Sequence, residues 1–241
     1  MPDPFPQVRG LSINWNMIDR ASYLREIDAL SGLDSLDFHV PVTFFVGENG
    51  SGKSTLLEAI AVAAGFNPEG GTKNYRFSTR DSHSELGGAL RLIRGTAGTR
   101  WGYFLRAESF YNVATAEEEY ARLGGTPHHY HSRSHGESFL AIAQDNFKGG
   151  GLYLLDEPEA ALSPRRQLTL MLEIVRCAKE NAQFIIVTHS PILLAIPEAE
   201  ILSFDDGSIH TVDYEDTDSF IVTEMFIRDR KRVLKHLLED E

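Results

Sequence analysis

The sequence has only one cysteine, Cys177, among its 241 residues. A single thiol cannot form an intrachain disulfide, and this scarcity is typical of proteins in reducing compartments. The sequence also lacks an apolar run long enough to span a bilayer, and its first residues, MPDPFPQVRG, lack the basic and apolar segments of a secretory signal. We therefore expect a soluble, cytoplasmic protein with no membrane segment of its own.

Basic residues are few as well: 23 Lys and Arg stand against 35 Asp and Glu, which gives a net charge of -12. Such a balance argues against a chain whose whole surface binds nucleic acid. The stretch from Gly71 to Arg106 is an exception and is rich in basic residues, and two interpretations of it stay open. It is either an ordinary solvated sheet surface or a local patch that faces phosphates, so nucleic acid remains an unproven partner. Its basic residues are Lys73, Arg76, Arg80, Arg91, Arg94, Arg100 and Arg106.

Strand-like and helix-like segments alternate along the chain. Apolar, β-branched runs predict strands at 6–14, 35–47, 151–158 and 183–190, and apolar residues at helical spacing predict helices at 17–30, 53–65, 164–182 and 223–238. Asp206-Gly207 predicts a hairpin turn within 201–214. Alternation of this kind favours an α/β fold with a largely parallel sheet. We expect one domain over residues 1–241.

The segment VGENGSGKST, residues 46–55, matches the pattern G-x-x-x-x-G-K-[ST]. A buried strand should enter it and a helix should leave it, which is the context that a phosphate-binding loop needs. Glycines let the backbone wrap a phosphate and offer its N–H groups, and the helix N-terminus favours negative charge. We expect Lys53 to neutralise phosphate oxygens and Ser54 to ligate Mg²⁺. The candidate nucleotide-binding residues are Gly47, Glu48, Asn49, Gly50, Ser51, Gly52, Lys53, Ser54 and Thr55.

Two further strands end in polar residues. Asp156 ends the apolar strand of LYLLDEPEAAL, where a P-loop fold needs a carboxylate for its metal ion. Glu157 follows it and is our candidate general base. In IIVTHS, His189 follows another buried strand and would reach the γ-phosphate at the same edge of the sheet. Taken alone, these acids and this histidine would be assigned to the solvated surface; after a P-loop they indicate catalysis.

The stretch HSRSHGESFL, residues 131–140, is open to three interpretations. It could hold the nucleophile of a serine hydrolase, but the sequence has no G-x-S-x-G elbow here. It could hold a metal together with neighbouring histidines, but their spacing matches no familiar zinc pattern. It could also be a loop that contacts a phosphate. The histidines concerned are His128, His129, His131 and His135.

The P-loop, the acidic strand and the histidine strand, in this order, resemble the ATP-binding cassette superfamily, and the resemblance extends over roughly the whole chain. It implies a P-loop ATPase with a mostly parallel central sheet, an antiparallel β subdomain and a small helical subdomain at approximately 108–148. The family's signature loop would then include Ser134, Gly136 and Glu137, which would contact the nucleotide of a second subunit. This third interpretation is the one that we favour for HSRSHGESFL.

Several positions depart from the family's pattern. His135 and Glu137 replace a glycine and a glutamine of the signature, and Ser163 in AALS replaces the usual aspartate of the D-loop. Glu108 stands where the family has the Q-loop glutamine, and we assign it to the metal. The segments DEPEAALSP and THSPILLA look more like the compact, stand-alone cassette ATPases of bacteria, related to repair and chromosome-maintenance ATPases, than like transporter cassettes.

The resemblance implies an enzyme that converts ATP and water to ADP and phosphate with Mg²⁺. It also implies a homodimer that closes head to tail on ATP, with a role in DNA maintenance or defence. Two alternatives stay open: the nucleotide-binding subunit of a transporter, and a slow ATP-gated switch without significant turnover. A GTPase is disfavoured because the sequence has no N-K-x-D motif.

Overall fold

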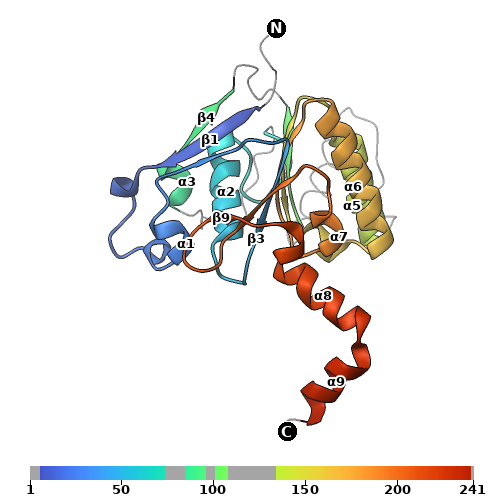
Figure 1. Cartoon of the computed structure of the whole chain (residues 1–241). Coiled ribbons are helices and arrows are strands. Elements are labelled where there is room, and N and C mark those ends of the chain that lie inside the picture. The colour runs from blue at the N-terminus through green and yellow to red at the C-terminus, as the bar shows by residue number, and fades with distance from the viewer. Residues whose placement is uncertain (1–5, 74–84, 96–100, 108–133, 240–241) are drawn as a thin grey trace.

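The computed structural model describes residues 6–73, 85–95, 101–107 and 134–239 of the chain. Within them the strands form a six-stranded sheet in the order β5-β6-β7-β3-β8-β9 and a three-stranded sheet in the order β2-β1-β4. Figure 1 shows the two sheets with helices beside and between them. The predicted helical subdomain at 108–148 lies largely outside the described residues, and only its last part, from residue 134, is seen.

The central sheet is mostly parallel, as the sequence predicts. All its pairings are parallel except that of β8 with β9. Every residue of β3, β6 and β7 is buried, which is why these strands read as continuous apolar runs. The strands are β3 (Val42–Val46), β5 (Gly102–Arg106), β6 (Leu152–Asp156), β7 (Gln183–Val187), β8 (Glu200–Ser203) and β9 (His210–Thr211).

The smaller sheet is antiparallel and contains β1 (Val8–Ile13), β2 (Ser35–Asp37) and β4 (Leu90–Arg94). The side chain of Gln183, at the start of β7, ties this sheet to the central one. It accepts from the Val8 N–H at 2.8 Å and donates to the Val8 carbonyl at 2.9 Å. The mostly parallel central sheet and the antiparallel β subdomain therefore agree with the architecture that we expected.

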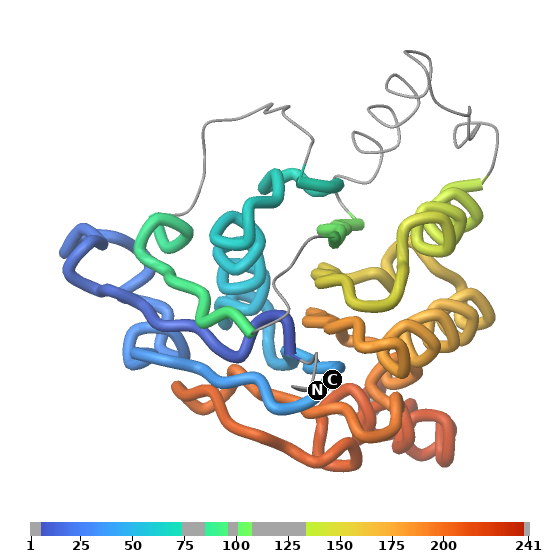
Figure 2. The backbone as a smooth tube through the Cα atoms, turned by 90° about the horizontal axis from the view of Figure 1, so that it is seen from above, coloured from blue at the N-terminus to red at the C-terminus, as the bar shows by residue number. Residues whose placement is uncertain are grey.

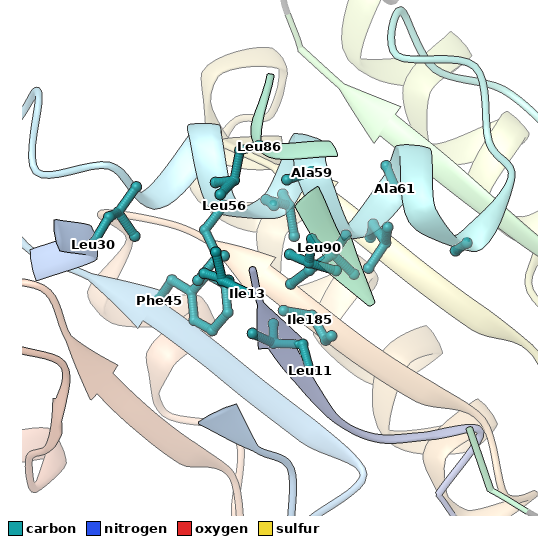
Figure 3. Close-up of a cluster of buried hydrophobic side chains, with 14 of the residues drawn as sticks. Leu11, Ile13, Leu30, Phe45, Leu56, Ala59, Ala61, Leu86, Leu90 and Ile185 are labelled. Carbon is teal, nitrogen blue, oxygen red and sulfur yellow. The ribbon is translucent and has the colours of Figure 1, made fainter. Parts of the chain in front are cut away.

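Helix α2 (Lys53–Ala64) lies between the two sheets, as the view from above shows (Figure 2). Its buried side chains, such as Leu56 and Ala59, pack with Leu11 and Leu90 of the small sheet and Ile185 of the central sheet (Figure 3). Short helices α1 (Asp28–Ser31) and α3 (Leu86–Ala89) join the same cluster. A second core on the other face of the central sheet includes side chains of α5 (His135–Asn146), α6 (Pro164–Lys179) and α7 (Pro191–Leu194).

The helix predicted over 17–30 is wrong. The chain instead forms two single 3₁₀ turns, Trp15–Met17 and Tyr23–Arg25, and the short α1. The Arg25 guanidinium donates to the carbonyls of Trp15, Ile18 and Asp19. These carbonyls therefore bind a side chain and not the N–H group four residues ahead, as they would in an α-helix. The Asp19 carboxylate accepts from the Ala21 N–H at 2.8 Å, a local bond that competes with helix formation.

Two further predicted segments are divided. The strand predicted over 35–47 is two strands in different sheets, β2 and β3, separated by a stretch that includes Pro41, which cannot donate to a ladder. The helix predicted over 223–238 is also two, α8 (Asp218–Arg228) and α9 (Arg230–Glu239). The backbone leaves the helical region at Asp229, with φ -141° and ψ 58°, and the Asp229 carboxylate accepts from the Arg232 N–H at 3.2 Å. Asp229 thus begins a new helix.

The remaining predicted elements agree with the structure. They are the strands at 6–14, 151–158 and 183–190, the helices at 53–65 and 164–182, and the hairpin around Asp206-Gly207, formed by β8 and β9. In the part of the chain that is described, no helix is long and apolar enough to cross a membrane.

Candidate functional site

The loop between β3 and α2 has the backbone of a phosphate cradle. Gly47, Gly50 and Gly52 have φ angles of 131°, 85° and 99°, in the left-handed region that favours glycine. A Cβ atom on Gly52 would also lie 2.8 Å from Cγ2 of Ile27. The glycines of VGENGSGKST are therefore required by the loop's conformation, and α2 begins directly after it with its free N–H groups.

Lys53 points its ammonium group back over this loop. Its Nζ donates to the carbonyls of Gly47 at 2.6 Å and Glu48 at 2.7 Å, and the residue is only 4% exposed. Burial lowers the pKa of Lys53, and the carboxylates of Asp205, Glu157, Glu48 and Asp156 oppose part of that effect. A cation is thus held in the concave side of the loop, where phosphate oxygens would need one.

Ser54 and Asp156 meet at the carboxyl edge of the central sheet. The Ser54 hydroxyl donates to Oδ1 of Asp156 at 2.8 Å, although the two residues are 102 positions apart. Ser54 lies in the first turn of α2, and Asp156 is the last residue of β6. A hydroxyl and a carboxylate are oxygen ligands of the type that Mg²⁺ prefers. The pair therefore fits the magnesium site that the sequence predicts.

Arg106 is a residue of this site that sequence reasoning assigned only to the basic region. Its Nε lies 3.3 Å from Oδ2 of Asp156, and its Nη1 lies 2.7 Å from Oε2 of Glu58. Arg106 and Asp156 are register partners at the ends of the parallel strands β5 and β6. That pairing was the available signal, because adjacent parallel strands bring their last residues together. Arg106 holds Asp156 in place and balances its charge.

Glu157 is held in an unusual backbone conformation. Its φ of 48° and ψ of 51° lie in the left-handed region, which costs a non-glycine residue roughly 1–2 kcal/mol. Its N–H donates to the Val187 carbonyl at 3.0 Å, so the residue is anchored to the end of β7. Strained residues of this kind concentrate at functional sites. The sequence predicted the residue but not its conformation.

His189 follows β7 and is exposed. It lines a cleft of about 730 Å³ together with the first half of the P-loop, Gly47, Glu48 and Asn49. The predicted histidine and the predicted loop therefore share one cleft.

Glu159 is a second residue that the sequence analysis missed. Its Oε1 accepts from the His189 N–H at 2.6 Å and its Oε2 accepts from the Thr188 hydroxyl at 2.7 Å. Burial raises the pKa of Glu159, and the two hydrogen bonds oppose that effect. The carboxylate links the turn after β6 to the loop after β7 and so fixes the backbone that carries His189. No pattern in DEPE distinguishes this acid from its neighbours.

The segment that we assign to the signature loop leads into α5. The Ser134 N–H and hydroxyl donate to Oε2 of Glu137 at 2.9 and 2.6 Å, and Oε1 of Glu137 pairs with Arg166 at 2.9 Å. Gly136 is buried, and a Cβ atom on it would lie 2.8 Å from the carbonyl oxygen of Ala161. The start of α5 is therefore fastened to the segment that follows Glu157, and Ser134 itself is exposed.

Several predicted residues lie outside the described part of the chain, so their placement stays a prediction. They are Glu108, His128, His129, His131, Arg76, Arg80 and Arg100. Of the basic residues that are described, Arg94 donates to the Ala63 carbonyl at 3.3 Å and Lys73 lies 5.1 Å from the ring centre of Phe66. Over the described ranges, no group of three or more His, Cys, Asp or Glu residues could hold a metal ion.

Two protein-family models each match one part of the chain. A model described as an AAA domain matches residues 23–117, which include the P-loop, and a model described as an AAA domain, putative AbiEii toxin, Type IV TA system, matches residues 138–195, which include Asp156 and His189. A probable export ATP-binding/permease protein of Pseudomonas fluorescens (strain Pf0-1) is 27% identical over 232 residues, which cover 87% of this chain and 34% of that protein. The macrolide export ATP-binding/permease protein MacB of Azoarcus sp. (strain BH72) is 28% identical over 207 residues, which cover 76% of this chain and 31% of that protein.

Most of the chain is therefore similar to export ATP-binding/permease proteins, and parts of it match AAA domain models. The chain spans about a third of the length of the curated relatives that it matches. Among the solved structures found in the comparison is cbiO1 from Clostridium perfringens, with a TM-score of 0.48 and 15% identity over 97% of this chain and 100% of that one. The SMC head domain from Thermotoga maritima has a TM-score of 0.47 and 15% identity over 86% of this chain and 100% of that one.

The names of these relatives describe them as ATP-binding proteins. The carboxyl edge of the central sheet carries the P-loop, Asp156, Glu157 and His189.

Proposed function

We propose that this chain binds ATP with Mg²⁺ and hydrolyses it to ADP and phosphate, in a homodimer that closes head to tail on ATP. The main support for this proposal is the 2.8 Å hydrogen bond from the Ser54 hydroxyl to the Asp156 carboxylate. It brings the two oxygen ligands that the P-loop chemistry needs to one point, beside an ammonium group held over the loop.

Each residue then has a defined task. The N–H groups of the P-loop and Lys53 would bind the β- and γ-phosphates, and Ser54 and Asp156 would hold the metal ion. When bound, Mg²⁺ would supply positive charge that neutralises the phosphate oxygens. The Glu157 carboxylate accepts a proton from the attacking water, and His189 donates a hydrogen bond toward the γ-phosphate. Glu108 is proposed as a further metal-site residue.

The dimer is proposed from the start of α5, where Ser134 and Glu137 are exposed. A 12-residue helix begins there, and the positive end of its dipole favours a phosphate. Glu137 would place a negative charge near that phosphate, but its ion pair with Arg166 offsets the charge. Ser134, Gly136 and Glu137 of one subunit would thus cover the nucleotide bound by the P-loop of the other. Two-fold symmetry would make two such sites.

Magnesium removal and Asp156→Asn test the hydrolytic function together. Phosphate release from ATP should require Mg²⁺ and stop with excess EDTA. Asp156→Asn should lower turnover by on the order of a hundredfold at fixed Mg²⁺, because a neutral amide is a poor metal ligand. Asp34→Asn, at an exposed carboxylate in front of β2, is the matched control and should keep wild-type turnover. Phosphate release that is absent in wild type, or unchanged by EDTA and by Asp156→Asn, contradicts the proposal.

Glu159 gives a test of the positioning of His189. Glu159→Ala removes both accepted hydrogen bonds and should lower turnover on the order of tenfold with ATP affinity unchanged, because a displaced group loses alignment. Glu159→Gln keeps an amide oxygen for the His189 N–H and should recover most of that turnover.

The stability of the same two variants is a second measurement. Because the pKa of Glu159 is raised in the folded state, its ionised form opposes folding at pH values above that pKa. The neutral Glu159→Gln should therefore unfold at the same temperature as wild type or higher, as followed by circular dichroism. Wild-type turnover in Glu159→Ala would remove this residue from the mechanism.

We propose a role in DNA maintenance or defence and keep two alternative roles. The segments DEPEAALSP and THSPILLA support a stand-alone ATPase in DNA maintenance or defence, and a phosphate-release assay with and without DNA addresses that role. The curated relatives are export ATP-binding/permease proteins, which supports the alternative of a transporter's nucleotide-binding subunit. Co-purification with a membrane protein would favour the transporter. A slow ATP-gated switch predicts ATP binding without steady phosphate release.

A further inference from the structure

The last two helices, α8 and α9, form an extension that we call the C-terminal arm (Asp218–Glu239). Figure 1 shows the arm leading away from the two sheets, and α8 has no buried residue. Six of its large apolar side chains are between 45% and 77% exposed: Ile221, Val222, Met225, Ile227, Leu237 and Leu238. A helix with apolar residues on several sides is normally buried, and exposed apolar patches mark contact surfaces. The arm therefore has the surface of an element that packs against another molecule.

The arm begins at the edge of the sheet that carries the candidate nucleotide site. Asp218 and Ser219, its first residues, line the same cleft of about 730 Å³ as Gly47, Glu48 and His189. Tyr214, just before the arm, donates to the carbonyl of Pro191, in the segment after His189. The arm thus starts beside the face that, in the proposed dimer, meets the second subunit.

Charge indicates which molecule the arm contacts. Helix α9 contains Arg230, Lys231, Arg232 and Lys235 and only one acid, Glu239. The whole chain has a net charge of -12, so the rest of it is strongly acidic. A second copy of the chain is therefore a partner of net negative charge for the basic α9. An anionic lipid surface would attract α9 but repel the rest of the protein.

A second copy also offers an apolar surface. A groove of about 760 Å³ between α6, α7 and α8 is lined mostly by apolar side chains, among them Leu168, Met171 and Ile192. Leu168 is 51% exposed, and its neighbour on α6, Leu172, is 68% exposed. The groove is also lined by Phe220 and Ile227 of the arm itself, so the arm and the groove form one continuous apolar surface. Two-fold pairing of two chains would cover this surface on each of them.

We propose that the C-terminal arm of each protomer packs on a second copy of this chain and stabilises the ATP-closed dimer. The apolar side of the arm covers the groove between α6, α7 and α8 of the second copy, and the basic residues of α9 face its acidic surface. This inference rests on the proposed ATP-dependent dimer. It adds a contact surface that lies outside the nucleotide site.

The apolar contact is tested in the Glu157→Gln background, where slow turnover should preserve the ATP dimer. Ile227→Ser with Leu238→Ser should raise the dimer dissociation constant in ATP and Mg²⁺ at least about tenfold, as measured by sedimentation equilibrium. The affinity of the monomer for ATP should not change. Ile93→Ser, at an exposed apolar residue on β4, is the matched control and should leave the dimer constant unaltered.

The charge contribution is tested separately. Arg230→Glu, Lys231→Glu and Arg232→Glu together should weaken the ATP dimer at low salt by on the order of tenfold, and the difference from the native arm should shrink as salt rises. Arg91→Glu, at an exposed arginine on β4, is the control for charge.

The outcomes separate this inference from the function on which it rests. If Glu157→Gln with a native arm stays monomeric in ATP, the proposed dimer is wrong and the arm contact with it. If that protein dimerises and the arm variants dimerise equally tightly, only the arm contact is wrong. Cosedimentation of the native arm with phosphatidylglycerol vesicles, lost in the arm variants while the dimer constant is unchanged, would assign the arm to lipid and overturn the proposal.

Discussion

Replacing Glu157 with glutamine should lower steady phosphate release by on the order of a hundredfold or more, with ATP and Mg²⁺ binding preserved. Glutamine has nearly the same shape as glutamate but cannot accept a proton from water. The Glu157 N–H bond to the Val187 carbonyl is a backbone contact, so the substitution keeps the anchor of this turn. Calorimetry for ATP affinity and a coupled phosphate assay for turnover measure the two effects independently.

Glu173→Gln is the control for the loss of a carboxylate. Glu173 lies on α6 and pairs with Arg176 at 2.9 Å, away from the P-loop. Its substitution should leave turnover unaltered. Equal turnover in Glu157→Gln and wild type would exclude Glu157 as the general base.

Lys53→Ala should weaken ATP binding by on the order of a hundredfold, because it removes the charge that the P-loop holds for the phosphates. Lys179→Ala, at an exposed lysine on α6, should bind ATP as wild type does. Calorimetry that finds equal ATP affinity in Lys53→Ala and wild type would contradict the P-loop assignment.

The pH dependence of ATP binding follows from the same residue. Burial lowers the pKa of Lys53 from its usual 10.5, so its charge is lost at a lower pH than in an exposed lysine. ATP affinity should therefore fall as pH rises through that lowered pKa. Over the same range the unfolded chain binds more protons at this position than the folded one, so Lys53 itself makes the free energy of unfolding rise with pH.

The parts of the site that the sequence predicted are those with local signals. The glycines of the P-loop follow from the left-handed backbone at Gly47 and Gly52, and a motif with fixed spacing carries that information. Asp156 was predictable because it ends a run of apolar residues that are buried on both faces of a parallel sheet. The contact between Ser54 and Asp156 then follows from the topology, since both lie at the carboxyl edge.

The residues that the sequence did not reveal depend on contacts between distant segments. Arg106 forms its ion pair with Asp156 because β5 and β6 are neighbouring strands in register. Glu159 accepts from the His189 N–H because the turn after β6 lies beside the loop after β7. The wrong helix at 17–30 has a similar cause: its apolar spacing is helical, but the Arg25 guanidinium and the Asp19 carboxylate bind backbone groups that a helix would need. Periodicity does not report such competition.

In the proposed dimer, each nucleotide is covered by Ser134, Gly136 and Glu137 of the second subunit. The molar mass of Glu157→Gln in light scattering tests this arrangement most directly. With ATP and Mg²⁺ the variant should have the mass of a dimer, and with ADP that of a monomer, because only ATP offers a γ-phosphate to two acidic chains that otherwise repel. Adding Ser134→Arg should return the ATP sample to monomer mass while calorimetry still finds ATP bound. A dimer mass that persists in the double variant, or a mass that is the same in ATP and ADP, would contradict the account.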